Sequence, residues 1–226
     1  LKRSGCDTVG DVEWCVCSTA QMVYHFVNAW EDESTGEIIV IGVREDGFFH
    51  GALSPKGTRE WIDQTLVEGI SVPRMHEWRI DPIRHEVTSE RWLFDDLVEV
   101  PRINDAFTGV RSRFAYGGRI HSDSLRMDAQ LKFDAVIKYD LETDETQIYE
   151  HGKGRYGMEA QFVPRKHAPS DSKNVEDDGW LILYVHDESE CGLAATNKTE
   201  CVILDAKNIE AGPLLRIVLP SRVPYG

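Results

Sequence analysis

The sequence has little positive charge and no long apolar run. Its 226 residues include 25 lysines and arginines against 39 aspartates and glutamates, a formal net charge of −14, without any run of basic residues. Nucleic-acid binding needs a basic surface, so nucleic acid is excluded as the leading partner. No apolar stretch approaches the roughly 18 residues that span a bilayer. A composition of 41% hydrophobic and 28% charged residues also excludes intrinsic disorder.

Both ends lack the features of a natural terminus. The chain starts at Leu1 instead of methionine, no signal peptide follows, and residues 223–226 come directly after a strand-like run. We therefore expect residues 1–226 to be a piece of a longer protein. The length predicts one domain or two small ones, with enough chain to bury a core.

Cysteine is sparse and odd in number, which excludes a disulfide framework. Cys15 and Cys17 lie two apart in a strand-like segment, and side chains at that spacing share one face of a strand. Buried, reduced thiols are predicted in preference to zinc or redox chemistry. This favours a reducing compartment, cytoplasmic or plastid-like. The five cysteines are Cys6, Cys15, Cys17, Cys191 and Cys201.

Short runs rich in β-branched and aromatic residues predict an all-β fold. Polar, glycine-containing segments such as residues 32–36 suit hairpin loops between them. Residues 57–68 give the one weak helical pattern. The predicted strands lie at residues 22–27, 38–43, 180–185, 202–204 and 214–219.

A strand that ends in aspartate, a polar turn and a return strand recurs along the chain. The aspartates are Asp81, Asp140 and Asp205, and each can cap its turn with its own carboxylate. Strand–turn–strand units repeating at several tens of residues are typical of β-propeller blades. We expect three to four blades, part of a propeller that is incomplete at both ends.

Familiar catalytic signatures are missing: there is no HExxH, no GxSxG and no phosphate-binding glycine loop. Among the eight histidines, His25 stands out because it lies within the apolar run Met-Val-Tyr-His-Phe-Val. On a strand, Val23, His25 and Val27 would share one face, where an imidazole needs a hydrogen bond or a metal. The residues leave both readings open, a satisfied core histidine or a metal ligand.

The other seven histidines sit in turns or beside charged residues. A surface or structural role is expected for all of them, namely His50, His76, His85, His121, His151, His167 and His186.

Two glutamates occupy uncharged, strand-like surroundings, where an unpaired charge is costly. Glu99 falls in Leu-Val-Glu-Val-Pro, and Glu159 falls in Tyr-Gly-Met-Glu-Ala. Each is interpreted either as a structural hydrogen-bond acceptor or as a carboxylate that orients a metal-bound histidine.

A family resemblance rests on these same residues. Residues 24–31, YHFVNAWE, resemble the His-x-x-Asn-Ala-Trp/Tyr-Glu motif of the carotenoid cleavage oxygenases, which include apocarotenoid, epoxycarotenoid and lignostilbene dioxygenases. The resemblance spans nearly the whole chain. Further matches follow in the family's order at residues 75–78, 99–104, 139–143, 159 with 162–165, 177–180, 204–206, 219–220 and 223–226.

The resemblance implies the C-terminal portion, residues 1–226, of a single seven-bladed β-propeller domain with iron(II) held on its axis by four histidines. His25 would be the third ligand, and the other three would lie outside this chain. Glu99 and Glu159 would be two of the glutamates that accept hydrogen bonds from ligand histidines. Tyr24 and Val100, neighbours of His25 and Glu99, would line the substrate tunnel.

The implied activity is that of a non-haem iron(II) dioxygenase. It would use O2 to cleave a carbon–carbon double bond of a carotenoid, an apocarotenoid or a stilbene into two carbonyl products. The fragment alone is expected to be inactive, and the sequence does not bear on the association with membrane surfaces found in some relatives. Two rivals remain: a non-catalytic propeller scaffold of kelch or WD type, and a propeller hydrolase with paired carboxylates.

Overall fold

Strands account for most of the chain that the computed structural model describes, namely residues 13–19, 21–45, 73–121, 131–166, 176–189 and 198–225. The all-β prediction is confirmed. The described residues do not include the weakly predicted helix at residues 57–68, nor Cys6, Cys191, His50 and His167. The strands are β1 (Met22–Glu31), β2 (Ile38–Glu45), β3 (Arg74–Asp81), β4 (Glu86–Trp92), β5 (Val98–Arg102), β6 (Phe114–Ile120), β7 (Phe133–Asp140), β8 (Glu145–Glu150), β9 (Arg155–Gly157), β10 (Gln161–Pro164), β11 (Gly179–Asp187), β12 (Lys198–Asp205) and β13 (Pro213–Val218).

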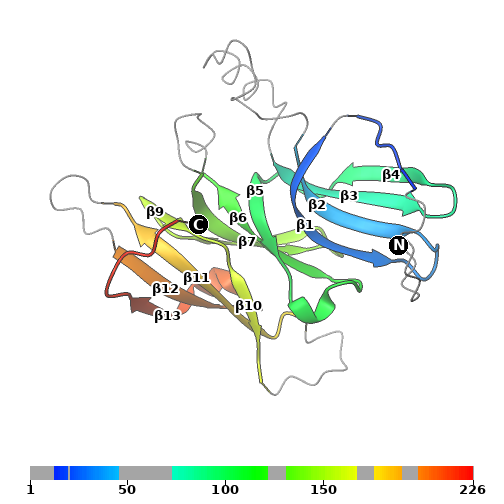
Figure 1. Ribbon diagram of the computed structural model, residues 1–226. Coiled ribbons are helices and arrows are strands. Elements are labelled where there is room, and N and C mark those ends of the chain that lie inside the picture. Colours follow the sequence, from blue (N-terminus) through cyan, green and yellow to red (C-terminus); the bar gives the residue numbers. More distant parts are fainter. Residues whose placement is uncertain are drawn as a thin grey trace, which may run out of the picture.

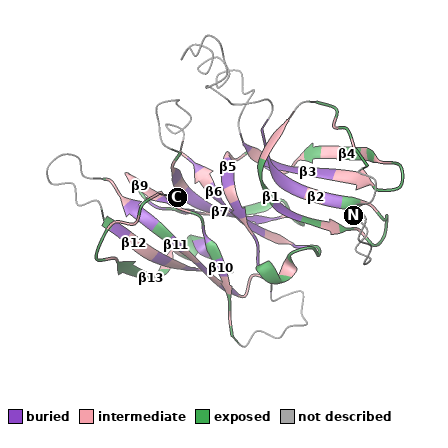
Figure 2. Ribbon diagram, in the orientation of Figure 1, coloured by how far each residue is buried: buried purple, intermediate pink, exposed green. Residues whose placement is uncertain are grey.

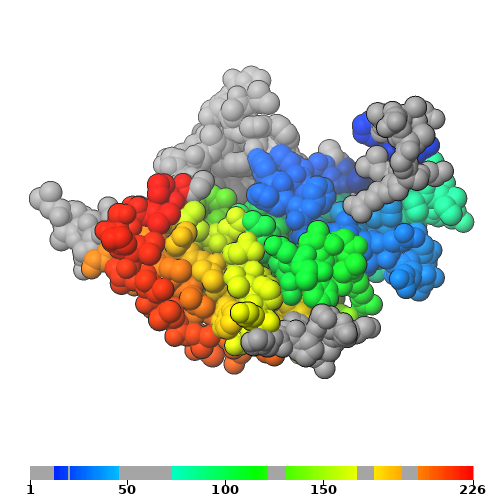
Figure 3. Space-filling view, turned by 60° about the horizontal axis from the view of Figure 1, so that its bottom comes forward, coloured from blue at the N-terminus to red at the C-terminus, as the bar shows by residue number. Residues whose placement is uncertain are grey.

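The strands form three antiparallel meanders of four strands each, which are the blades of a β-propeller (Figure 1). The first blade is β1–β4, the second is β5–β8 and the third is β10–β13. The short strand β9 pairs with both β7 and β11, so the second and third blades are hydrogen-bonded into one sheet. In the space-filling view the blades follow one another in chain order, from blue through green to red (Figure 3).

The hairpin at the outer end of each blade has the predicted aspartate turn. The carboxylate of Asp81 accepts the backbone N–H of the residue two positions on at 2.8 Å. Asp140 and Asp205 make the same bond at 3.1 and 3.0 Å. The repeat read from the sequence is therefore confirmed in all three blades.

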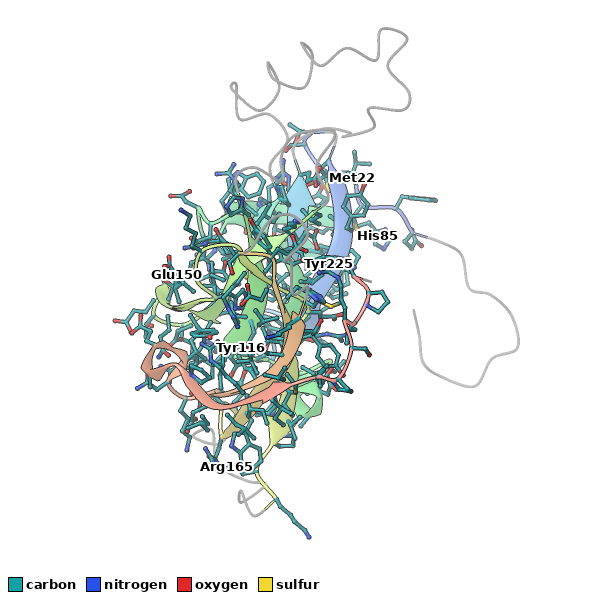
Figure 4. The ribbon with its side chains drawn as sticks, turned by 90° about the vertical axis from the view of Figure 1, so that its left-hand side faces the viewer. Met22, His85, Tyr116, Glu150, Arg165 and Tyr225 are labelled. Carbon is teal, nitrogen blue, oxygen red and sulfur yellow. The ribbon has the colours of Figure 1, made fainter. Side chains whose placement is uncertain are left out.

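The hydrophobic core lies between the blades. Buried residues concentrate on strands such as β2, β7 and β11, whereas β4 and β13 contain none (Figure 2). One cluster joins the first and second blades and includes Val27, Ile41, Met75, Val98 and Tyr139. A second cluster joins the second and third blades and includes Tyr116, Val136, Phe162, Leu181 and Leu204. Tyr116 lies deep among the strands (Figure 4).

The regular alternation predicted for β1 is wrong. The pairing of β1 with β2 shifts register between Val23 and Phe26 and again between Phe26 and Asn28. A bulge interrupts the two-residue period of a strand. As a result Tyr24, His25 and Phe26 are all exposed, whereas Val27 is buried.

One further expectation needs correction, because residues 13–17 form no strand. Cys15 and Cys17 are nevertheless both half-buried free thiols, while Trp14 and Val16 are exposed.

His76 and His186 lie within β3 and β11, each beside a charged residue, and both are buried, as is His151.

No helix among the described residues is long and apolar enough to cross a membrane. Within the described ranges there are two 3-10 helices, each a single turn, η1 (Asp105–Phe107) and η3 (Ile209–Ala211).

Candidate functional site at His25 and Glu99

His25 and Glu99 come from the first strands of two neighbouring blades and meet side by side. Nδ1 of His25 lies 2.6 Å from Oε2 of Glu99. A carboxylate oxygen accepts, so Nδ1 donates this hydrogen bond, which in a neutral imidazole leaves Nε2 with its lone pair. The His25 side chain is 55% exposed while that of Glu99 is 7% exposed. The pair therefore combines an anchored imidazole with a ring nitrogen that is open to a ligand.

The two readings of His25 differ in what surrounds the imidazole. Among the described residues the bulges of β1 leave its side chain 55% exposed, so the apolar residues of its own strand do not enclose it. The metal-ligand reading stays a prediction. The hydrogen bond to a carboxylate is the usual environment of a metal-ligating histidine, because it fixes the tautomer and orients the ring.

Glu99 is held by its own backbone as well as by His25. Its Oε2 also accepts the N–H of Val100 at 2.8 Å. Val100 has a φ of 50°, the left-handed region that β-branched residues avoid. Such a backbone costs on the order of 1–3 kcal/mol and persists only where the surroundings fix it.

Asn28, three residues after His25, ties β1 to the loop between β5 and β6. Its Nδ2 donates to the carbonyl oxygens of Phe107 and Val110 at 3.0 and 2.9 Å. Its Oδ1 accepts the backbone N–H of Gly109 at 3.0 Å. Asn28 belongs to the motif that carries the family resemblance, but no role was predicted for it. The signal in the sequence that could have identified Asn28 is a lone asparagine within an apolar strand.

The structure does not bring Glu159 to His25. Glu159 precedes β10 on the third blade, is about half exposed, and forms an ion pair with Arg102 of β5. A carboxylate paired with a surface arginine is also found at structural positions. The proposed orienting role of Glu159 therefore remains a prediction.

The tunnel assignment of Tyr24 and Val100 also remains a prediction. Tyr24 is 56% exposed and stands beside His25, and Phe26 on its other side is 62% exposed. A hollow of about 900 Å³ lies elsewhere, where residues 109–112 face β2 and β3. Its lining includes the charged Glu77, Arg79 and Arg91, which does not suit an apolar polyene.

No three metal-ligating side chains converge within the described ranges. His25 fits a metal as a single ligand, because its Nε2 makes no hydrogen bond to the described residues and its Nδ1 is bonded to Glu99. A complete site would need further ligands beyond the described residues.

The RPE65 family model, described as retinal pigment epithelial membrane protein, matches residues 1–226. Over 217 residues the chain is 33% identical to carotenoid 9,10(9',10')-cleavage dioxygenase 1 of Arabidopsis thaliana, covering 90% of this chain and 35% of the relative. It is 31% identical over 207 residues to the chromoplastic zeaxanthin 7,8(7',8')-cleavage dioxygenase of Crocus sativus, covering 89% and 48%. The chain thus spans between a third and a half of these relatives.

Solved structures show the same fold. The cobalt-substituted apocarotenoid oxygenase of Synechocystis superposes with a TM-score of 0.69 at 23% identity, covering 90% of this chain and 38% of that one. A chimera of that oxygenase with RPE65 gives a TM-score of 0.69 at 22% identity, with the same coverage.

Proposed function

This chain belongs to the RPE65 family together with carotenoid cleavage dioxygenases, and on that premise we propose that the protein cleaves a carbon–carbon double bond of a carotenoid or apocarotenoid with dioxygen. The two products would be carbonyl compounds. The observation that carries this proposal is the His25–Glu99 pair, in which Nδ1 lies 2.6 Å from a buried carboxylate oxygen and the imidazole is about half exposed among the described residues.

Within this proposal His25 would bind iron through Nε2. The hydrogen bond to Glu99 would keep the proton on Nδ1 and fix the orientation of the ring. Iron(II), when bound, supplies the activation of dioxygen. A neutral imidazole adds no negative charge, and the Glu99 carboxylate raises its basicity through the Nδ1 hydrogen bond. The remaining three histidine ligands would come from outside this chain. Glu159 would serve a second ligand histidine in the same way as Glu99 serves His25.

The apolar side chains beside His25 support a polyene substrate. Tyr24 and Phe26 flank His25 in sequence and are both exposed. Exposed aromatic groups next to a metal ligand suit the wall of an apolar binding site. Val100, next to Glu99, would extend this wall. Both relatives compared above are named for cleaving carotenoids, which favours a carotenoid over a stilbene.

We also propose that residues 1–226 are the C-terminal portion of one propeller domain. The apolar clusters run from blade to blade without interruption, which supports a single domain. The coverage of only 35% of the Arabidopsis relative supports a longer parent.

The two rival functions fit less well. A kelch or WD scaffold does not require an imidazole that is hydrogen-bonded to a carboxylate of the next blade. A hydrolase needs two carboxylates facing each other across a substrate. Glu99 instead bonds His25, and Glu159 pairs with Arg102.

The test is metal analysis and turnover of the complete protein. We expect about one iron per chain, and cleavage of an apocarotenoid into two carbonyl products with 18O incorporated from 18O2. The matched control is a His25→Ala variant, which should lose both iron and turnover. A purified protein that holds no iron and leaves apocarotenoids intact would contradict the proposal.

A further inference from the structure

Two features of the sequence disfavour the backbone conformation of Val100. It is β-branched, and it precedes Pro101, which normally forces the preceding residue to be extended. Its φ of 50° lies in the left-handed region all the same. The described chain has only two other non-glycine residues with positive φ, His85 and Asp144, and both lie in hairpin turns. Val100 lies in a strand beside the candidate site.

The left-handed turn redirects one N–H group. Between Glu99 and Arg102 the pairing of β5 with β6 shifts register, so Val100 and Pro101 leave the regular ladder. Pro101 has no N–H to satisfy. The N–H of Val100 points to the Glu99 carboxylate, at 2.8 Å from Oε2.

The opposite strand leaves room for this bulge. Gly117 of β6 faces it, and a Cβ atom there would lie 2.3 Å from Cγ2 of Val98. A side chain at Gly117 would therefore push β5 away. The close approach of the two strands depends on glycine at this position.

We propose that the Val100 backbone is a positioning element, which holds the Glu99 carboxylate so that its Oε2 accepts the hydrogen bond from Nδ1 of His25. Both hydrogen bonds end on this one oxygen. The terminal torsion of a glutamate side chain takes a broad range of angles. Without the bond from the Val100 N–H, the Glu99 carboxylate would therefore be free to rotate. Its consequence for the metal rests on the proposed function, whereas the positioning of His25 does not need a metal.

The test compares two substitutions in the complete, metal-free protein. Val100→Ala removes the side chain but keeps the N–H, and Val100→Pro removes the N–H and fixes φ near −65°. The tautomer of His25 is read from 15N shifts of labelled histidine, with folding checked by circular dichroism. We expect the Nδ1–H tautomer in the parent and in Val100→Ala. We expect Val100→Pro to shift to the Nε2–H tautomer that unrestrained histidines prefer.

Affinity for cobalt(II), measured on the same samples, gives the second readout. Losing the partner of a ligand histidine weakens metal affinity by about 10–100-fold, and we expect this loss in Val100→Pro alone. A folded Val100→Pro variant that keeps the Nδ1–H tautomer would overturn the positioning role. A tautomer shift in a protein that binds no cobalt would leave the positioning role intact and refute the proposed metal site.

Val100→Pro could also fail to fold, so a measurement on the unaltered protein is included. Hydrogen exchange at the Val100 amide should be slowed by at least about 100-fold relative to a free peptide, because the N–H is bonded to a buried carboxylate. Exchange at the free-peptide rate would overturn the proposal.

Discussion

Nδ1 of His25 lies 2.6 Å from Oε2 of Glu99, although 74 residues separate them in the chain. The two residues stand on the first strands of adjacent blades, and Val27 and Val98 in those strands share one apolar cluster. The hydrogen bond is therefore only as well defined as the packing between these blades. Any change that separates the blades also releases the imidazole.

The carboxylate of Glu99 is expected to control metal affinity. Glu99→Gln keeps the shape of the side chain but removes its charge, so the Nδ1 hydrogen bond weakens. Iron affinity of the complete protein should fall by about 10–100-fold. Glu150→Gln is the matched control, since Glu150 is an exposed glutamate of β8 that bonds Arg119 (Figure 4). Equal iron content in both variants would remove Glu99 from the site.

Residues 1–226 on their own are expected to be inactive and to bind iron loosely. His25 supplies one ligand bond, and no three metal-ligating side chains converge among the described residues. Iron titration of the isolated chain beside its His25→Ala variant measures this. Stoichiometric binding that depends on His25, together with alkene cleavage, would contradict the four-histidine assignment.

Asn28 is expected to matter for stability more than an ordinary buried polar residue. Asn28→Ala removes its amide and leaves the carbonyl oxygens of Phe107 and Val110 without their donor. A hydrogen bond contributes roughly 0.5–1.5 kcal/mol net, and this substitution removes those to Phe107, Val110 and Gly109, so we expect a loss of about 2–4 kcal/mol.

Urea unfolding of Asn28→Ala beside Asn208→Ala provides the comparison. Asn208 caps the short helix η3, where its side chain accepts from the N–H of Ala211. Losing a cap costs about 1 kcal/mol. Equal losses in the two variants would show that Asn28 does not anchor the loop.

His151 is expected to make the fold sensitive to mild acid. Burial, together with the positive charges of the nearby Arg155, Arg216 and Arg119, lowers the pKa of this imidazole to about 3. In the unfolded chain its pKa is about 6.5. The unfolded state therefore binds more protons below pH 6.5. Stability is fully present above that pH and declines as the pH falls from about 6.5 towards 3.

Between pH 7 and pH 5 this group alone should remove about 2 kcal/mol of stability. His151→Leu should flatten that part of the pH dependence. Free energies of unfolding from urea titrations at the two pH values give the answer. The same pH dependence in parent and His151→Leu would exclude this histidine as its source.

The fold was largely predictable because its repeating signal is local. The aspartate turns depend on a carboxylate and an N–H two residues away, so Asp81, Asp140 and Asp205 could be identified without tertiary information. The position of His25 was not predictable in this way. The register shifts of β1 occur opposite Gly42, where a Cβ atom would lie within 3.1–3.3 Å of Val23, Phe26 and the His25 carbonyl oxygen.

The pairing of Glu99 with His25 was not predicted: the residues indicated a carboxylate that could orient a metal-bound histidine, but not which histidine. Periodicity places a residue on a face of a strand, but it does not say which strand of another blade lies opposite. The backbone of Val100 could not have been predicted either, since a valine before proline indicates an extended conformation. Its left-handed turn results from the contacts of Glu99 and the close approach of Gly117.

Because the core lies between the blades and not within them, single blades are not expected to evolve independently. A blade cut away from its neighbours would lose one whole side of each apolar cluster that it shares. Single blades are therefore unsuitable as units of exchange between proteins, unlike domains that carry their own interior. Variation should accumulate instead in the connections between strands, while the facing residues of adjacent blades, such as Val27 and Val98, change together or not at all.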